Sequence, residues 1–531
     1  MTQATPRHQS NPITPTTTKT TNKTIIPAPA PNTTALSLVG SRGKKVPTSF
    51  IGFSLETWTI PKLAGNTRHP AGPLLRLTKA LGSNGAVNIR IGGDSQDRSW
   101  WLANPHRVPS KMLSDRQLPS TIANAVSAAR GSEYFTTPHW VDIATNFLRA
   151  TGSPAIIGLN LAENNPEHVA SFAAAVYNKL PEHQLQAFEV GNEPSLYWRF
   201  PATWNKNKGQ LVASNKQRIF NFSNLVNDWH RYSRALRRKI GANVPLAGNA
   251  LGCPGMRWCD KSKEFYNRFH SNLRLATMHV YAMRQPVNLR DRQDLSNPFY
   301  PSISRLLKPV NSTSISQRFK DQIQLAHQSG LPIRLDEFNT TPFGGAPGVS
   351  DSFGAALWAP EAMFSMHQAG LDGVNFHFGY GTSYKPFWIK WLHGKPSAEV
   401  APIYYGIYFF SRAIQNQARV IPLRIQNKQP GLSTWLLKDR DNNYRLAIIN
   451  KNQQSRTVSI GLPTRSTAHL AVLGASSLEA TSGIRWAGQS FGADGRLHGR
   501  QHYSKIQANN SIYKVQAPAQ SAALLVVPSH S

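Results

Sequence analysis

Two glutamates stand at the ends of short apolar runs that have the composition of β-strands. Glu193 follows the run 188–192 (Phe-Glu-Val-Gly-Asn), and Glu337 follows the run 331–336 (Leu-Pro-Ile-Arg-Leu-Asp). If both runs are parallel strands of one barrel, their carboxyl ends meet at one mouth, where such barrels gather catalytic residues. Hydrolysis of a glycosidic bond uses two acids, one to protonate the leaving oxygen and one to attack or stabilise the sugar cation. The two glutamates therefore predict a glycoside hydrolase.

The residues beside the two glutamates predict different roles for them. Glu193 is expected to be the general acid/base, and the amide of Asn192 to hydrogen-bond the sugar 2-hydroxyl as positive charge develops on the ring. Glu337 is expected to be the nucleophile, held ionised by a hydrogen bond from Tyr281. Asp336 is expected to point the opposite way, because side chains alternate along a strand, and is the weaker candidate.

Further polar residues stand at the ends of the predicted strands. Arg90 is expected to pair with a carboxylate and so support the nucleophile. His279 is interpreted either as a substrate ligand or as a histidine that is hydrogen-bonded within the barrel mouth. The rest of this set is Glu56, Asp94, Asn160, Asn249, Asn339, Asn375 and His377. Such a concentration of polar residues at strand ends is typical of a barrel active site.

Eight apolar runs alternate with segments of helical periodicity over the first three quarters of the chain. The predicted strands are 48–55, 87–91, 155–160, 187–191, 245–249, 275–281, 332–336 and 372–377. This alternation favours an α/β fold of the closed (β/α)8 TIM-barrel type over an open doubly wound sheet. No glycine-rich loop with phosphate- or dinucleotide-binding spacing follows the first two strands.

Beyond Tyr408 the helical periodicity is replaced by short alternating runs separated by turn residues. These runs predict a C-terminal antiparallel β-sandwich domain. Residues 1–34 are rich in Thr and Pro and are predicted to be a disordered tail. The predicted division of the chain is the tail (1–34), a strand contributed to the sandwich (35–47), the catalytic barrel (48–400) and the sandwich (401–531).

The chain carries a formal net charge of +32 at pH 7 over 531 residues. Such a field attracts polyanions such as nucleic acid, an anionic membrane or an acidic polysaccharide. No zinc-finger spacing, RNA-recognition motif or long Lys/Arg block is present, so no nucleic acid partner is expected. No run approaches the ~20 apolar residues of a membrane-spanning helix, so no membrane partner is expected. The charge fits an acidic polysaccharide substrate, and it fits equally the surface of a secreted or acid-tolerant protein.

Two cysteines, Cys253 and Cys259, lie close together in the sequence. They either close a short disulfide loop, which would indicate an oxidising compartment, or remain two free thiols. No His or Cys stands near them at metal-ligand spacing, so no zinc site is predicted. A secreted or periplasmic location is expected, although residues 1–34 contain no recognisable signal peptide and a cytoplasmic location stays open.

Six stretches of the chain resemble glycoside hydrolase family 79, which contains β-glucuronidases and heparanase. They are 49–56, 90–97, 188–197, 279–281, 336–353 and 375–386. The segment 483–491 also resembles the sandwich of that family, so the resemblance extends from about residue 48 to the C-terminus. The Asn-Glu-Pro motif at 192–194 is by itself typical of a whole clan of retaining barrel enzymes, whereas the ordered set is typical of the family.

The resemblance implies a β-linked glucuronic acid in the subsite on the non-reducing side of the scissile bond. It also implies that the sugar carboxylate is held by the backbone amides of Gly344 and Gly345 and by Tyr384. Glu56 and Asp94 match positions that contact the distal hydroxyls in family members. The contacts to the carboxylate would distinguish a uronic acid from a neutral sugar.

The predicted function is a retaining glycoside hydrolase that cleaves β-linked glucuronic acid from glycans or glycosides. It would act through a covalent intermediate on Glu337, without a metal or organic cofactor and without an obligate protein partner. The expected substrate is a glucuronate-containing oligo- or polysaccharide. Phe343 stands where the family often has a tyrosine and cannot donate a hydrogen bond, so a β-glycosidase for a neutral sugar such as xylose is an alternative. A non-catalytic binder of acidic polysaccharide is a second alternative, against which the presence of both glutamates argues.

Overall fold

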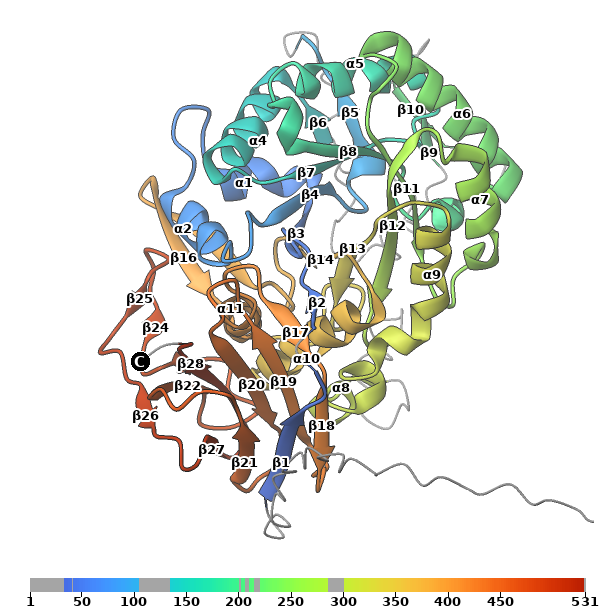
Figure 1. The fold of residues 1–531 in the computed structure, drawn as a ribbon. Coiled ribbons are helices and arrows are strands. Elements are labelled where there is room, and N and C mark those ends of the chain that lie inside the picture. The colour runs from blue at the N-terminus through green and yellow to red at the C-terminus, as the bar shows by residue number, and fades with distance from the viewer. Residues whose placement is uncertain are drawn as a thin grey trace, which may run out of the picture.

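The computed structural model describes residues 33–40, 42–104, 134–199, 202–205, 210–213, 220–284 and 300–529. These residues form a barrel of parallel strands wrapped by helices and, beside it, a second body of antiparallel sheets (Figure 1). The tail predicted to be disordered, 1–34, lies outside the described residues except for Thr33 and Thr34. None of the described helices is long and apolar enough to span a membrane.

Eight parallel strands close into a barrel, which confirms the predicted TIM-barrel architecture. Around the ring the strands are β11 (Leu246–Gly252), β12 (Leu273–Tyr281), β13 (Ile333–Asn339), β14 (Gly373–Phe378), β3 (Ile51–Glu56), β4 (Asn88–Gly92), β7 (Ala155–Leu159) and β8 (Leu185–Val190). β4, β7, β11, β13 and β14 are buried along their whole length. Because the barrel interior fills one face of each strand and helices cover the other, these strands are apolar runs rather than alternating ones.

Helices between the strands surround the barrel (Figure 1). The α-helices of the described residues are α1 (Ile60–Ala64), α2 (Gly72–Ala80), α4 (Pro138–Thr151), α5 (Pro166–Tyr177), α6 (Phe222–Lys239), α7 (Ser262–Phe269), α8 (Ile303–Leu306), α9 (Lys320–Gln328), α10 (Phe353–Ala369) and α11 (Pro402–Ala413). In α4, the hydroxyl of Thr137 accepts a hydrogen bond from the backbone N–H of Trp140, and Gly152 ends the helix in the left-handed conformation. The apolar face of α4, which includes Trp140 and Phe147, lies in the barrel core.

β13 contains a β-bulge at Asp336. Consecutive residues of β12 lie opposite Leu335 and Glu337, so Asp336 has no residue opposite it. A bulge interrupts the alternation of side chains along a strand and often re-aims them beside an active site. Asp336 and Glu337 therefore both reach the interior Arg90, at 3.8 Å and 2.9 Å. The prediction that Asp336 points away from the site is wrong for this reason.

The C-terminal region forms two packed sheets, which confirms the predicted antiparallel sheet domain. One sheet contains β18 (Leu423–Gln426), β1 (Thr33–Leu38), β21 (Arg456–Gly461) and β27 (Ile512–Ala517). The other contains β2 (Lys44–Lys45), β17 (Arg419–Ile421), β19 (Leu432–Lys438), β20 (Tyr444–Asn450), β28 (Ser521–Val527), β22 (Ala468–Gly474), β23 (Arg485–Trp486) and β26 (Ser504–Ile506). β1 runs parallel to β21 and antiparallel to β18, so the N-terminal end of the described chain lies within the sandwich.

The second sheet joins the sandwich to the barrel. In β20, Leu446 and Ile448 lie in the core between the two sheets, whereas Ala447 and Ile449 lie in the core shared with the barrel helices. Because successive side chains of a strand point to opposite faces, both faces of β20 are buried. The second sheet is therefore the middle layer between the first sheet and the barrel helices. α11 packs closely against α10, because a Cβ atom at Gly406 would lie only 2.1 Å from a carbonyl oxygen of α10.

Four two-stranded sheets are present in addition to the barrel and the two sheets of the sandwich. They are β5 (Ser99–Trp101) with β6 (Tyr134–Thr136), β9 (Ala202–Asn205) with β10 (Gln210–Ala213), β15 (Phe387–Leu392) with β16 (Lys395–Val400), and β24 (Ser490–Phe491) with β25 (Leu497–His498). β15 and β16 follow the loop after β14, and they lie on the side of the barrel that faces α2 (Figure 1).

Candidate active site

A cavity of about 400 Å³ opens at the carboxyl ends of the barrel strands. Pockets of this size hold small ligands. Both predicted catalytic acids, Glu193 after β8 and Glu337 on β13, form part of its wall. The other predicted site residues that line it are Glu56, Asp94, His279, Tyr281, Gly344, His377 and Tyr384. Asn192 and Gly345 stand behind this wall rather than in it.

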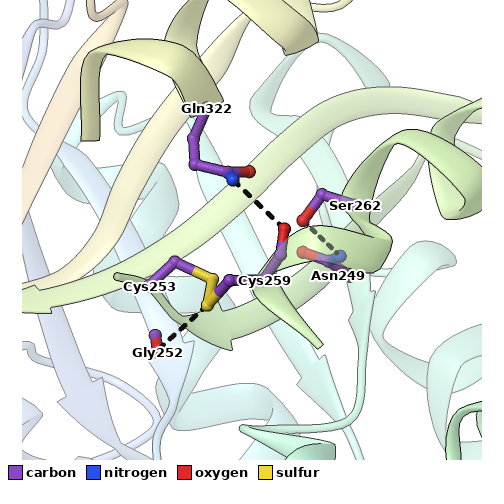
Figure 2. Close-up of a disulfide and its surroundings, with 6 residues drawn as sticks. All are labelled: Asn249, Gly252, Cys253, Cys259, Ser262 and Gln322. Carbon is purple, nitrogen blue, oxygen red and sulfur yellow. Dashed lines mark hydrogen bonds between the residues drawn. A yellow bond between two sulfur atoms is a disulfide. The ribbon is translucent and has the colours of Figure 1, made fainter. Parts of the chain in front are cut away.

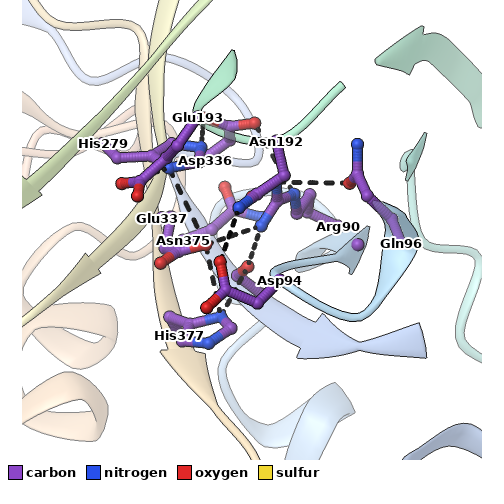
Figure 3. Close-up of polar contacts among 12 residues, drawn as sticks. Arg90, Asp94, Gln96, Asn192, Glu193, His279, Asp336, Glu337, Asn375 and His377 are labelled. Carbon is purple, nitrogen blue, oxygen red and sulfur yellow. Dashed lines mark hydrogen bonds and ion pairs between the residues drawn. The ribbon is translucent and has the colours of Figure 1, made fainter. Parts of the chain in front are cut away.

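The side chains of Glu193 and Glu337 approach each other at the floor of the cavity (Figure 3). One oxygen of each carboxylate and one ring nitrogen of His279 lie within 4.8 Å of one another. The carboxyl groups of a retaining glycosidase are roughly 5–5.5 Å apart, whereas an inverting enzyme needs roughly 6.5–9.5 Å to admit a water molecule. The separation of the two acids therefore fits direct attack on the sugar carbon by one of them.

Glu337 is surrounded by groups that stabilise its charge. The hydroxyl of Tyr281 donates to Oε1 at 2.8 Å, and Nη1 of Arg90 donates to Oε2 at 2.9 Å. Burial disfavours the charge, but His377, the guanidinium of Arg90 and the bond from Tyr281 hold the pKa of Glu337 well below its usual range. An acid that stays ionised and is held from two sides is suited to nucleophilic attack.

Arg90 on β4 connects the nucleophile to buried residues beneath the cavity. Besides Glu337, it donates to Oε2 of Glu189 at 2.7 and 3.0 Å and to Oδ1 of Asn192 at 2.8 Å. Burial works against the charged guanidinium, but the carboxylates of Glu189, Asp336 and Glu337 raise the pKa of Arg90 further above its usual value. A permanent positive charge therefore stands beneath the nucleophile.

Glu193 follows β8 in a strained turn. Its φ of 46° lies in the left-handed region, which residues other than glycine adopt rarely, and its backbone N–H donates to the carbonyl of Ala250 at 3.0 Å. The side chain meets His279, whose Nδ1 lies 3.2 Å from Oε1 of the carboxyl group. The turn and the histidine together aim this acid into the cavity.

Asp97 anchors the same turn, although it was not among the predicted site residues. Its Oδ2 accepts hydrogen bonds from the backbone N–H of Asn192 at 2.8 Å and from the hydroxyl of Tyr197 at 2.9 Å. Its Oδ1 accepts from the backbone N–H of Leu161 at 2.8 Å. Burial raises the pKa of Asp97 to about 7, although these hydrogen bonds act in the opposite direction. The only signal was its place at the end of the 90–97 stretch.

A second group of polar residues forms the wall opposite His279. Glu56 accepts hydrogen bonds from the backbone N–H of Ser95 at 3.0 Å and from its hydroxyl, and Oε1 of Glu56 lies 3.3 Å from Nε2 of His377. Burial lowers the pKa of His377, but Glu337 and Glu56 raise it more. The amide nitrogen of Asn192 donates to Oδ1 of Asp94 at 3.1 Å. Asn192 therefore connects Arg90 to Asp94 and keeps one amide hydrogen for another acceptor.

The loop after β13 brings Gly344 to the cavity, and the loop after β14 brings Tyr384. Phe343, Gly344 and Gly345 all have positive φ, between 59° and 88°, so the chain turns sharply here. The backbone N–H of Gly345 points back to the carbonyl of Pro342 at 3.4 Å. A Cβ atom at Gly345 would lie 2.9 Å from the backbone nitrogen of Tyr384, so this glycine packs the loop against Tyr384. Of the two predicted glycines, only Gly344 borders the cavity.

Four of the asparagines predicted at strand ends do not line the cavity and bond to other protein groups. Asn160 donates to the carbonyl of Ser99, Asn249 to the hydroxyl of Ser262, Asn339 to the carbonyls of His377 and Tyr384, and Asn375 to Asn88 and Phe53. The bond of Asn249 lies beside the disulfide (Figure 2). These side chains hold strands and loops in place.

The cysteines form a disulfide, Cys253–Cys259, in the loop after β11 (Figure 2). Cys253, Pro254, Gly255 and Met256 line the cavity on the side of Glu193. A Cβ atom at Gly252 would lie 3.3 Å from Oε1 of Glu193, so the start of this loop lies directly against the acid. The disulfide fixes one wall of the cavity.

Two groups of side chains have donor atoms close enough to surround a metal ion. They are Glu189, His279 and Asp336, and Glu193, His279 and Glu337. The guanidinium of Arg90 lies 2.7 to 3.8 Å from Glu189, Asp336 and Glu337. A cation placed among these carboxylates would be repelled by the charge that Arg90 already supplies. The donor set is better described as an ion-pair network than as a metal site.

The chain is similar to two fungal β-glucuronidases. It is 22% identical to the β-glucuronidase of Aspergillus niger over 539 aligned residues, which cover 90% of each chain. It is 22% identical to the β-glucuronidase of Neurospora crassa over 395 residues, which cover 67% of this chain and 62% of the relative. The resemblance to glycoside hydrolase family 79 is confirmed. The prediction of a glycoside hydrolase is confirmed with it.

Solved structures of other glycosidases share the fold of this chain. A 4-O-α-L-rhamnosyl-β-D-glucuronidase from Fusarium oxysporum superposes with a TM-score of 0.71 at 18% identity and covers 93% of this chain and 100% of its own. An arabinofuranosidase from Xanthomonas axonopodis pv. citri superposes with a TM-score of 0.58 at 15% identity, covering 93% and 99%. At these identities the likeness establishes the barrel-and-sandwich fold alone. No family model matches the chain.

Proposed function

We propose that this chain is a retaining β-glucuronidase that acts on glucuronate-containing carbohydrates. The observation that carries the proposal is the placement of Glu193 and Glu337, whose nearest oxygens lie within 4.8 Å in a cavity of about 400 Å³. This spacing suits double displacement. The names of the two fungal relatives support glucuronic acid as the sugar.

In the first step, Glu193 protonates the glycosidic oxygen while Glu337 attacks the anomeric carbon. The bond from the carbon to the leaving oxygen breaks, and a covalent glycosyl–enzyme ester forms on Glu337. Arg90 and Tyr281 hold Glu337 ionised and aimed before the attack. His279 contacts Glu193 and so orients the acid toward the leaving group.

In the second step, Glu193 accepts a proton from water, and the water oxygen attacks the anomeric carbon of the ester. Glu337 leaves as a carboxylate, and the sugar is released with its original configuration. The charge that returns to Glu337 is stabilised again by Arg90 and Tyr281. Asn192 joins Arg90 to Asp94 just behind the cavity wall, and its remaining amide hydrogen is proposed to reach the 2-hydroxyl of the sugar in front of it.

The uronic carboxylate is proposed to lie between Tyr384 and the backbone of Gly344. Both border the cavity, and burial together with Glu337 raises the pKa of Tyr384 well above its usual value, so its phenol stays a donor. Phe343 borders the same cavity but offers no donor. Glu56 and Asp94 lie on this side as acceptors for the distal hydroxyls.

An acidic aglycone is supported by two arginines on the leaving-group side of the cavity. Arg284 and Arg318 both line it, and they face each other closely enough that Arg284 adds to burial in lowering the pKa of Arg318. A Cβ atom at Gly255 would lie 3.6 Å from Arg284, which places this arginine next to the disulfide loop beside Glu193. With the net charge of +32, the pair favours an acidic oligo- or polysaccharide over a neutral one as the substrate.

A secreted or periplasmic location is part of the proposal. It is supported by the disulfide Cys253–Cys259, because disulfides persist mainly in oxidising compartments.

The test is hydrolysis of para-nitrophenyl glycosides by the purified chain. We expect turnover of the β-glucuronide, slow or no turnover of the β-xyloside, and a first-formed product in the β configuration by NMR. Variants Glu193→Gln and Glu337→Gln serve as matched controls, and both should lose activity while remaining folded. Faster turnover of the xyloside would favour the neutral-sugar alternative, and no turnover of any glycoside would favour a non-catalytic binder.

A further inference from the structure

Beneath the catalytic pair lies a buried group of side chains, of which the mechanism uses only His279. Glu189, His279 and Asp336 are each at most 1% exposed, and one donor atom of each lies within 4.8 Å of the others. The close-up of the site shows Asp336 beside His279 and Arg90 (Figure 3). Among the described residues, four of their buried atoms have no hydrogen-bond partner: Nε2 of His279, both oxygens of Asp336 and Oε1 of Glu189.

These four atoms can satisfy one another if two protons are placed correctly. Nε2 of His279 lies 3.5 Å from Oδ1 of Asp336, so an Nε2–H would donate to that oxygen. The remaining oxygens belong to Asp336 and Glu189, whose carboxyl groups approach within 4.8 Å, and a single proton shared between them replaces their repulsion by a hydrogen bond. A buried polar group without a partner is costly, so this arrangement is strongly preferred to one in which both carboxyls are ionised.

The surrounding charges also require a neutral Asp336. Burial and the nearby Glu189 raise the pKa of Asp336 well above its usual value, while Arg90 acts in the opposite direction. With all three carboxyls ionised, the single charge of Arg90 would have to balance Glu189, Asp336 and Glu337. The titratable groups that face Asp336 from the surrounding elements are Arg90, Glu189, Tyr266, His279, Arg334 and Glu337.

We propose that Asp336 is a positioning residue for the general acid and acts through His279 as a neutral carboxylic acid. Hydrogen-bonded to Glu189, it accepts the Nε2–H of His279 and so fixes the ring in the tautomer whose Nδ1 is an unprotonated acceptor. Nδ1 lies 3.2 Å from Oε1 of Glu193, so a hydrogen bond across this gap requires the proton to be on Glu193. The inference rests on the proposed function, in which Glu193 is the acid/base.

The consequence is a preference for the protonated form of Glu193. This form is consumed in the first step, when the proton passes to the leaving oxygen. The Glu193 carboxylate that remains faces the unprotonated Nδ1 of His279. Because these two acceptors repel each other, Glu193 is favoured to take a proton from the attacking water. If Asp336 is removed, His279 is free to carry its proton on Nδ1 and to stabilise the Glu193 carboxylate, which weakens the acid.

The experiment compares Asp336→Asn with Asp336→Ala. The amide of Asn offers an acceptor to His279 and a donor to Glu189, as the neutral acid does, so we expect kcat/KM within about 3-fold of wild type and an unchanged pH profile. In Asp336→Ala we expect the alkaline limb of kcat/KM to move to lower pH. The loss at neutral pH should be roughly 10-fold on phenyl glucuronide and much smaller on the nitrophenyl compound, whose better leaving group needs less acid assistance.

Two outcomes would overturn the proposal. A loss in Asp336→Asn as large as in Asp336→Ala would mean that the negative charge of Asp336 is needed, as in an ordinary ion pair with Arg90. An alkaline limb that does not move in Asp336→Ala would mean that the contact with His279 has no effect on the acid. Glu361→Gln is the control, because it removes a buried ion pair with Lys451 distant from the site and should lower stability without moving the pH profile.

A spectroscopic measurement decides the same question without turnover. In the infrared difference spectrum of wild type minus Asp336→Asn near pH 7, we expect a carbonyl band of a protonated carboxylic acid that shifts on ¹³C-aspartate labelling. A carboxylate band in its place would refute the neutral acid even if Asp336→Ala does not fold. A chain that shows this band but cleaves no glucuronide would contradict the proposed function and leave the buried acid intact.

Discussion

The phenolic oxygen of Tyr281 lies 2.8 Å from Oε1 of Glu337 and donates a hydrogen bond to it. Tyr281 ends β12 and Glu337 lies on the neighbouring β13, so the bond joins two strand ends at the barrel mouth. Burial, together with the charge of Glu337, raises the pKa of Tyr281 well above its usual value, so the phenol keeps its proton. The nucleophile therefore has a fixed donor on the side opposite Arg90.

Replacement Tyr281→Phe should move the acid limb of the kcat/KM profile to higher pH. Loss of the donor raises the pKa of Glu337, and attack requires the ionised form, so activity disappears at a higher pH as the solution is acidified. We expect kcat/KM to fall roughly 10-fold at neutral pH, since a hydrogen bond to a charged group is worth roughly 1.5–3 kcal/mol. The fall should be larger at pH values below the acid limb of the wild type. Tyr404→Phe, which removes a buried hydroxyl bonded to Leu77, is the control and should leave the limb in place.

Replacement Glu337→Ala should lower kcat on para-nitrophenyl β-glucuronide by roughly 10³-fold or more, because the covalent intermediate can no longer form. Azide should restore part of the rate by attacking from the vacated side, and the product should be the glycosyl azide of inverted configuration. Product analysis by NMR with and without azide checks this. Unimpaired hydrolysis would show that another residue is the nucleophile.

Replacement Tyr384→Phe should harm glucuronides far more than xylosides. The lost hydroxyl is proposed to donate to the uronic carboxylate, so kcat/KM on the glucuronide should fall roughly 10- to 100-fold. The xyloside has no such group, and its rate should change by less than about 3-fold. Tyr513→Phe, whose hydroxyl bonds to Ser466 in the sandwich, provides a folded control. Equal losses on both substrates would remove Tyr384 from carboxylate recognition.

Replacement Arg284→Gln should weaken cleavage of acidic oligosaccharides without affecting small aryl glucuronides. Arg284 is exposed and lines the leaving-group side of the cavity, so only a substrate with an anionic aglycone reaches it. We expect KM for a glucuronate-rich oligosaccharide to rise several-fold, with a weaker salt dependence than wild type. Arg274→Gln makes the same charge change at the opposite end of β12 and should have no such effect. A rise in KM for both variants would indicate general attraction by the net charge.

Much of the architecture could be predicted from local pattern. The buried strands of a barrel are short apolar runs, and the helices between them show amphipathic periodicity and capping residues, such as Thr137 and Gly152 around α4. The two acids were predictable because each stands where an apolar run ends. Their common position at the carboxyl ends of parallel strands then follows from the barrel itself.

Other parts of the site depend on contacts between residues that are distant in the chain. Arg90 and Glu337 are 247 residues apart in sequence and 2.9 Å apart in space, and no periodicity indicates which carboxylate a buried arginine will meet. Asp97 illustrates the same point, since its partners Asn192 and Tyr197 come from the turn after another strand. Of the two predicted glycine amides, that of Gly345 is not free for the substrate, because the turn directs its N–H to the carbonyl of Pro342.

The sequence by itself determined the order of strands and helices, the barrel class and the identity of the paired acids, because these follow from periodicity and residue type along one local segment. Only the tertiary structure decided that Asp336 faces inward. The bulge in β13 arises from pairing with both neighbouring strands, and alternation along the strand alone predicts the opposite. The burial that keeps a carboxyl neutral is likewise a property of the closed barrel, since it depends on which charges the fold brings around it.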